Sequence, residues 1–137
     1  MLFRSLAKQG DVWLDTARHP NLATRPDAVV VRVESGLMFA NADHVKSQIN
    51  ALSTDQTKIV VLDAETSPFV DVSAATMLVE LKSTLARRGI DFRIARDIGQ
   101  VRDTLERTGD APMLEIHPTI DDALTAYQRE ARQGTDD

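Results

Sequence analysis

The chain has 137 residues, of which 42% are apolar and 27% are charged, and it contains no cysteine. This length fits one ordinary domain that folds without disulfides, and the missing cysteines exclude thiolate metal sites and thiol nucleophiles. A formal net charge of -5 argues against general affinity for nucleic acid, whose phosphates repel an acidic surface. No apolar stretch reaches the roughly 20 residues that a membrane-spanning helix needs.

The first half of the chain predicts two strands and a helix. Residues 1–11 show no pattern and are expected to be a lead-in, whereas residues 12–16 predict a short strand at an edge of the sheet, with Trp13 in the core. Residues 29–33 are rich in β-branched side chains and predict a strand covered on both faces. The next helix is expected to have Asn41 as its N-cap. Its predicted inner face consists of Ala42, Val45, Ile49 and Leu52.

The second half of the chain alternates strands with helices. Residues 59–62 predict a fully buried strand, and Asp71 is expected to cap the longest central helix. A further strand is predicted over residues 90–94. Asp97 is then expected to cap a short helix that turns Ile98 inward.

The last predicted elements are a weak strand over residues 113–116 and a helix capped by Thr119. Residues 133–137 predict a disordered polar tail. The order of the elements indicates the α/β class, with a single-layer, mostly parallel sheet of about five strands flanked by about four helices. One domain is expected over residues 12–132.

The chain carries no recognisable catalytic or metal-binding motif. Its glycines are too scattered for a dinucleotide fingerprint or a phosphate loop, and no Gly-x-Ser-x-Gly elbow is present. His19, His44 and His117 include no pair at the i, i+4 spacing of a helical zinc site. We therefore predict no catalytic residue, no bound metal and no required cofactor.

One loop is a candidate binding site because it follows the most buried predicted strand. In an open parallel sheet, ligands bind beyond the carboxyl ends of the strands, and free N–H groups at a helix start favour an anion. The candidate residues in the segment 64–75 are Thr66, Ser67, Phe69, Asp71, Val72 and Ser73. A structural interpretation is equally supported: Asp71 caps the helix, Ser67 turns the chain and Phe69 fills the core.

Two segments of the chain have a family resemblance. Residues 29–43 include the run Phe39-Ala40-Asn41-Ala42 and resemble the second strand and helix start of the STAS domain in SulP-type anion transporters. Residues 59–63 and 69–75 are similar to the strand, Asp-containing loop and helix start found in every STAS domain, including the anti-sigma factor antagonists. The resemblance makes Phe39 and Asn41 a second candidate surface.

The residue after Asp71 separates the two branches of this family. The antagonists carry a phosphorylatable serine directly after the loop aspartate, whereas this chain has Val72, which has no hydroxyl. Ser73 does not simply substitute, because a helix turns by about 100° per residue. The resemblance therefore favours the transporter branch.

The resemblance implies a non-enzymatic, cytosolic regulatory and assembly domain of a sulfate or related anion transporter. The domain itself would be soluble and lie at the cytoplasmic face of the cell membrane, with residues 1–11 leading from the membrane domain. The implied partners are that transmembrane domain, a regulatory protein and a second copy in a dimer of the full protein. A nucleotide, GTP/GDP or ATP/ADP, is a further candidate ligand of the 64–75 loop. The alternative is a free-standing anti-sigma factor antagonist, phosphorylated on Ser73 or Ser67.

Overall fold

In the computed structural model, which describes residues 3–136 apart from the side chains of Phe39, Thr135 and Asp136, six strands form one sheet. The strand order is β2-β1-β3-β4-β5-β6. The bounds are β1 (Phe3–Gln9), β2 (Val12–Asp15), β3 (Ala28–Val33), β4 (Ile59–Asp63), β5 (Asp91–Ala95) and β6 (Glu115–His117). Strands β3 to β6 are parallel, and β1 is antiparallel to both of its neighbours. The predicted α/β class with a mostly parallel sheet is confirmed, with six strands rather than about five.

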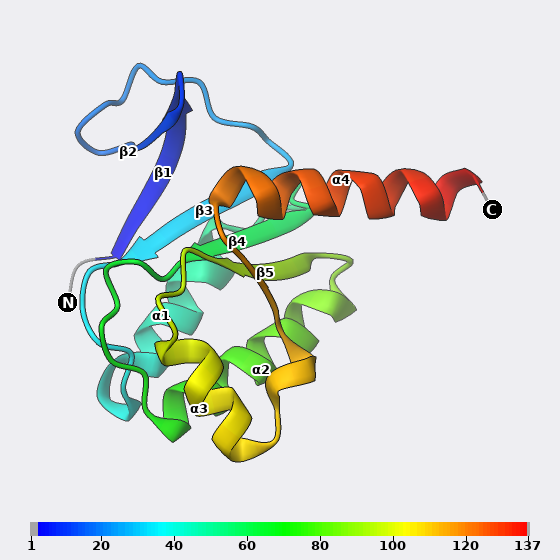
Figure 1. Cartoon of the computed structure of the whole chain (residues 1–137). Helices are drawn as coiled ribbons and strands as arrows, with labels where there is room; N and C mark the ends of the chain where they lie inside the picture. Colours follow the sequence, from blue (N-terminus) through cyan, green and yellow to red (C-terminus); the bar gives the residue numbers. More distant parts are fainter. Residues whose placement is uncertain (1–2, 137) are drawn as a thin grey trace.

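The helices cover the two faces of the sheet unequally (Figure 1). They are α1 (Phe39–Leu52), α2 (Val72–Arg87), α3 (Gln100–Thr108) and α4 (Ile120–Asp136), with a 3-10 turn over Ala111–Met113. Helices α1, α2 and α3 pack on the larger core, which includes Val31, Leu62 and Ile94. Helix α4 alone covers the smaller core on the opposite face, which includes Val30 and Val61. The side chains of each strand alternate between these two cores, as the pleat requires.

Strand β1 corrects the expectation of a patternless lead-in over residues 1–11. It places Leu6 and Ala7 in the buried core and joins β2 through a two-residue turn in which Gly10 has a φ of 59°. A left-handed backbone of this kind suits glycine, which has no Cβ to clash. The predicted edge strand is present as β2, but it pairs with β1 and not with β3. At the other end of the chain, residues 133–136 continue α4 instead of forming a disordered tail.

The predicted helix caps are partly confirmed. Asp71 accepts a hydrogen bond from the backbone N–H of Ala74 at 2.8 Å, and the hydroxyl of Thr119 accepts one from Asp122 at 3.0 Å. Asn41 is not an N-cap, since α1 begins at Phe39 and Asn41 lies in its first turn.

Three apolar side chains differ from their predicted burial. Ile98 is 71% exposed rather than turned inward. The N-cap of α3 is Gly99 rather than Asp97, although the carboxylate of Asp97 accepts a hydrogen bond from the N–H of Val101 in the first turn. Leu52 lies at the end of α1 and is exposed. Trp13 is half-buried and packs against the smaller core from its edge.

Candidate functional site

The predicted 64–75 loop leaves the carboxyl end of β4, whose five residues are all buried. Two of its three hydroxyl groups form hydrogen bonds that stabilise the fold. The side chains of Thr66 and Ser67 both donate to the carbonyl oxygen of Val33, at 3.0 and 2.8 Å. Ser67 is fully buried, whereas Thr66 and Ser73 are exposed. The structure therefore keeps Ser67 away from any ligand on the surface.

The two candidate surfaces predicted from the sequence meet at one end of the sheet. Leu37, just before α1, forms an isolated parallel bridge with Val70. The N–H of Leu37 donates to Phe69 at 2.6 Å, and the N–H of Asp71 donates back to Leu37 at 3.0 Å. A Cβ on Gly36 would lie 3.3 Å from both the backbone oxygen and the Cβ of Phe69, so glycine permits this close approach.

Asn41 organises this junction rather than facing a ligand. Its side-chain oxygen accepts from the N–H of Met38 at 3.0 Å, and its side-chain nitrogen donates to the carbonyl of Gly36 at 2.8 Å. Both bonds hold the segment before α1 in place. The side chain of Phe39, the other predicted residue of this surface, lies outside the described residues.

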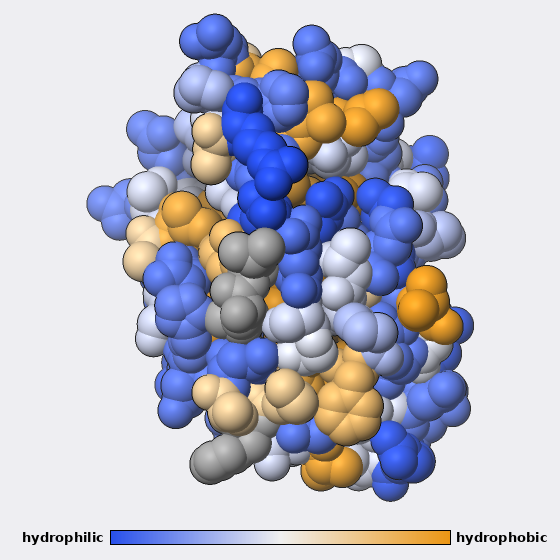
Figure 2. Space-filling view, turned by 90° about the vertical axis from the view of Figure 1, so that its left-hand side faces the viewer, coloured by the Kyte–Doolittle hydropathy of each residue, from blue (hydrophilic) through white to orange (hydrophobic). Residues whose placement is uncertain are grey.

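An apolar surface results where α1 and α2 begin. Met38, Phe69 and Val72 are 40%, 55% and 52% exposed, and we call them the strand-end patch. Figure 2 views the molecule from the carboxyl ends of the parallel strands and shows orange and light-orange side chains gathered at its lower end. Phe69 thus contributes to a surface and does not fill the core. Large apolar side chains held together on a surface are typical of sites that contact another protein.

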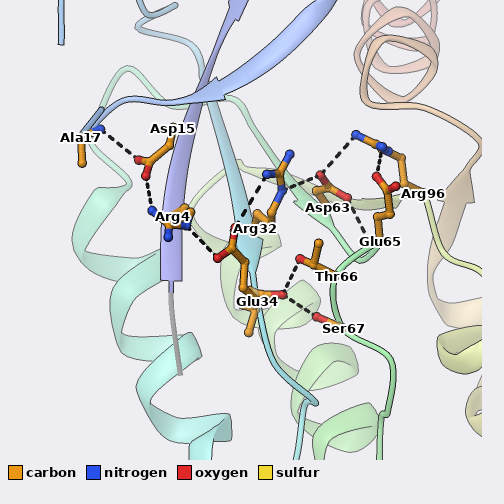
Figure 3. A network of polar contacts seen from close by, with 11 residues as sticks. Arg4, Asp15, Ala17, Arg32, Glu34, Asp63, Glu65, Thr66, Ser67 and Arg96 are labelled. Atoms are coloured by element: carbon orange, nitrogen blue, oxygen red, sulfur yellow. Dashed lines mark hydrogen bonds and ion pairs between the residues drawn. The ribbon is translucent and has the colours of Figure 1, made fainter. Parts of the chain in front are cut away.

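A chain of ion pairs crosses the sheet above this patch (Figure 3). Arg4 of β1 pairs with Asp15 and Glu34. Arg32 of β3 pairs with Glu34 at 3.9 Å and with Asp63 at 3.1 Å. Arg96, which follows β5, pairs with Asp63 and with Glu65 in the loop. The network therefore connects the N-terminal hairpin to the 64–75 loop through side chains on three neighbouring strand ends.

Asp63 is the most buried member of this network. Its side chain is 0% exposed and also accepts a hydrogen bond from the N–H of Glu65 at 3.0 Å. Burial raises the pKa of Asp63 above its usual range, against the hydrogen bond from Arg32 and the charge of Arg96, which lower it. The prediction from sequence missed this network. The sequence did contain a signal for it: Arg32 is a charged residue inside an otherwise apolar strand, and such a residue needs a partner of opposite charge.

The remaining polar candidates form no recognisable centre. His19 and His44 are exposed, and His117 lies beside the guanidinium of Arg93, 3.3 Å from its nitrogen. Among residues 3–136, no group of three or more His, Asp or Glu side chains is placed to hold a metal ion. Within the same range, no helix has the length and hydrophobicity needed to cross a bilayer.

Comparison with known proteins places this geometry in a family. The model of the STAS domain matches residues 19–123. A probable sulfate transporter of Mycobacterium tuberculosis is 32% identical over 124 residues, which cover 84% of this chain and 22% of the transporter. The chain thus spans about a fifth of the length of that relative.

Solved structures share the fold at lower identity. The murine Slc26a9 anion transporter, in its inward-facing state, superposes with a TM-score of 0.80 at 20% identity, over 93% of this chain and 22% of that one. An anti-sigma factor antagonist from Mycobacterium paratuberculosis superposes with a TM-score of 0.65 at 21% identity, over 91% of this chain and 93% of that one. The match over residues 19–123 shows that this chain belongs to the STAS domain family.

Proposed function

We propose that this chain is the cytosolic regulatory and assembly domain of a SulP-type sulfate or related anion transporter. The observation that carries the proposal is the 32% identity with a probable sulfate transporter over 84% of the chain. Val72, in the place where the antagonists have a phosphorylatable serine, gives it independent support. The absence of a hydroxyl at this position leaves no acceptor for the phosphate that switches those proteins.

The strand-end patch is the proposed docking surface for the transmembrane part of the same protein. Its three apolar side chains gain free energy when a partner removes them from water, at about 25 cal/mol per Å² of buried apolar surface. The bridge between Leu37 and Val70 and the cap at Asp71 hold the patch in a fixed shape. A preformed surface loses little conformational entropy on binding.

A nucleotide in the 64–75 loop has less support than a protein partner. A phosphate would need free N–H groups at the start of α2, where the carboxylate of Asp71 already accepts from Ala74. That carboxylate would also repel a phosphate. The buried hydroxyl of Ser67 is bonded to Val33. Of the two serines considered for phosphorylation, only Ser73 is exposed, so an antagonist function would depend on that residue.

The first test is the size and location of the native gene product. An antibody against this domain is applied to membrane and soluble fractions of the source cells. We expect a membrane-bound band much larger than the 15.1 kDa of this chain. A band of about 15.1 kDa in the soluble fraction would contradict the proposal and favour the free-standing antagonist.

The second test addresses the strand-end patch in the full-length transporter. Val72→Asp places a charge on the patch without disturbing the helix, because an acidic residue is favourable in the first turn. We expect sulfate uptake to fall about tenfold, the effect of losing about 1.4 kcal/mol of docking energy.

Met113→Asp is the matched control, because Met113 is 49% exposed and precedes β6 at the opposite end of the sheet. This variant should keep full uptake. Uptake and membrane abundance of Val72→Asp equal to those of the unmodified protein would rule out the patch as the docking surface.

A further inference from the structure

A cavity lies where β1 and β3 separate, at the end of the sheet opposite the strand-end patch. The two strands pair at only three positions, from Phe3 with Val33 to Ser5 with Val31. From Leu6 onward, β1 pairs with β2 instead, and Figure 1 shows the hairpin leaning away from β3. The first residues of β3, Ala28 to Val30, therefore pair with β4 alone. A cavity of about 470 Å³ opens between these strands.

The walls of this cavity come from elements that are far apart in the sequence. Leu6 of β1, Val30 of β3 and Leu124 of α4 form apolar parts of the lining, and all three belong to the smaller core. The side chain of Trp13 lines one wall, and the loop over residues 23–26 closes another. The volume falls within the range of about 300–1,000 Å³ that is typical of small-molecule sites.

The charged residues that line the cavity are already paired. Lys8 contacts the carboxylate of Asp121 at 3.2 Å across the cavity rim, and Arg25 contacts Asp27 at 2.8 Å. A charged ligand would have to give up its water without gaining an unpaired counter-charge, which is costly. The lining therefore offers no unpaired charge to a nucleotide or an inorganic anion.

Neutral polar groups are available in the same lining. The side chains of Thr24, Thr125 and Gln128 make no hydrogen bond with any other residue in the described part of the chain. A threonine hydroxyl both donates and accepts, and a glutamine amide offers both functions as well. These groups can bind a hydroxyl or carbonyl group of a ligand whose apolar part rests on Leu6 and Val30.

We propose that this cavity binds an uncharged small molecule with an apolar body and a few hydroxyl or carbonyl groups. Such a ligand would contact β1, β3 and α4 together and so fix the angle at which the N-terminal hairpin leaves the sheet. The site is separate from the strand-end patch and does not depend on the function proposed for it.

Two fluorescent probes test the proposal on the 137-residue chain. N-phenyl-1-naphthylamine is uncharged, and 1-anilinonaphthalene-8-sulfonate has the same ring system with an added sulfonate. Trp13 is the only tryptophan, so its emission reports directly on the cavity wall. We expect the uncharged probe to bind at a single saturable site and to quench Trp13, with the sulfonate binding about tenfold more weakly.

Three variants locate the probe. Thr125→Phe and Gln128→Phe each place a ring at the cavity rim on α4 and should weaken binding of the uncharged probe about tenfold. Thr76→Phe adds the same ring at an exposed position of α2, away from the cavity, and should change nothing. Two rim variants are used so that the failure of one to fold leaves a second measurement.

No saturable binding of the uncharged probe, or binding that is unchanged in both rim variants, would show that the cavity is not a ligand site. Equal affinity for the two probes would overturn the uncharged class of ligand.

Discussion

Asp63 combines full burial with contacts to two guanidinium groups. Because burial raises the pKa of its carboxyl group, the folded protein holds a proton on Asp63 more tightly than the unfolded chain does. The contribution of this group to stability is complete at a pH below the pKa of the unfolded chain. It is lost as the pH rises through the higher pKa of the folded state.

Asp63→Asn tests whether Asp63 stabilises the fold less as the pH rises. Asparagine stays uncharged at every pH. Its side-chain oxygen can still accept the hydrogen bond that the N–H of Glu65 donates to Asp63 at 3.0 Å. We expect the stability of the unmodified protein, relative to the variant, to decrease as the pH rises from about 4, the ordinary pKa of an aspartate, through the higher pKa of Asp63 in the folded protein. Urea unfolding of both proteins at several pH values measures this difference. A relative stability that increases with pH would mean that pairing with Arg32 and Arg96 outweighs burial.

Residues of the candidate site were predictable to different degrees. The cap at Asp71 followed from local sequence, because a helix start needs a side-chain acceptor for its free N–H groups. The exposure of Phe69 and the burial of Ser67 were not predictable in this way. Both depend on contacts between segments more than 30 positions apart in the chain, namely the bridge between Leu37 and Val70 and the hydrogen bond from Ser67 to Val33. Apolar character alone does not reveal whether a loop side chain faces the core or a partner.

Among the helices and strands, too, those set by local sequence were predictable and those that depend on distant contacts were not. Strand β4 was evident because its first four residues, Ile59 to Leu62, form a continuous apolar run. Strand β1 was missed because Arg4 breaks its apolar pattern, and that charge is compensated only by Asp15 and Glu34 in the folded sheet. The available signal was the dipeptide Gly10-Asp11 between two short runs, which is typical of a tight hairpin.

Leu6→Ala tests whether β1 is an integral element of the domain. Leu6 is 4% exposed and packs in the smaller core, so the substitution should lower the free energy of unfolding by about 2–4 kcal/mol. Val12→Ala, on the exposed edge strand β2, should change it by less than about 0.5 kcal/mol. Denaturant unfolding measures both variants. A small loss for Leu6→Ala would mean that the hairpin contributes little to the fold.

In the molecule as a whole, the helices shield the two faces of the sheet from water unequally. Three helices share the larger core, but the smaller core depends on α4, which contributes Ile120, Ala123 and Leu124 to it. These side chains cover Val61 and Ala95 in the central strands. The STAS fold of this chain therefore relies on its last helix to keep one face of the sheet out of water.

Two truncations test that dependence. Ending the chain at Pro118 removes α4 and exposes the smaller core, which should cost more than the roughly 5–15 kcal/mol that stabilises a domain of this size. We expect this protein to show no cooperative thermal transition by circular dichroism. Ending the chain at Arg132 removes only residues 133–137 and should change the free energy of unfolding by less than about 0.5 kcal/mol. A cooperative transition in the shorter protein would show that the larger core is sufficient for folding, and α4 would then be an accessory helix.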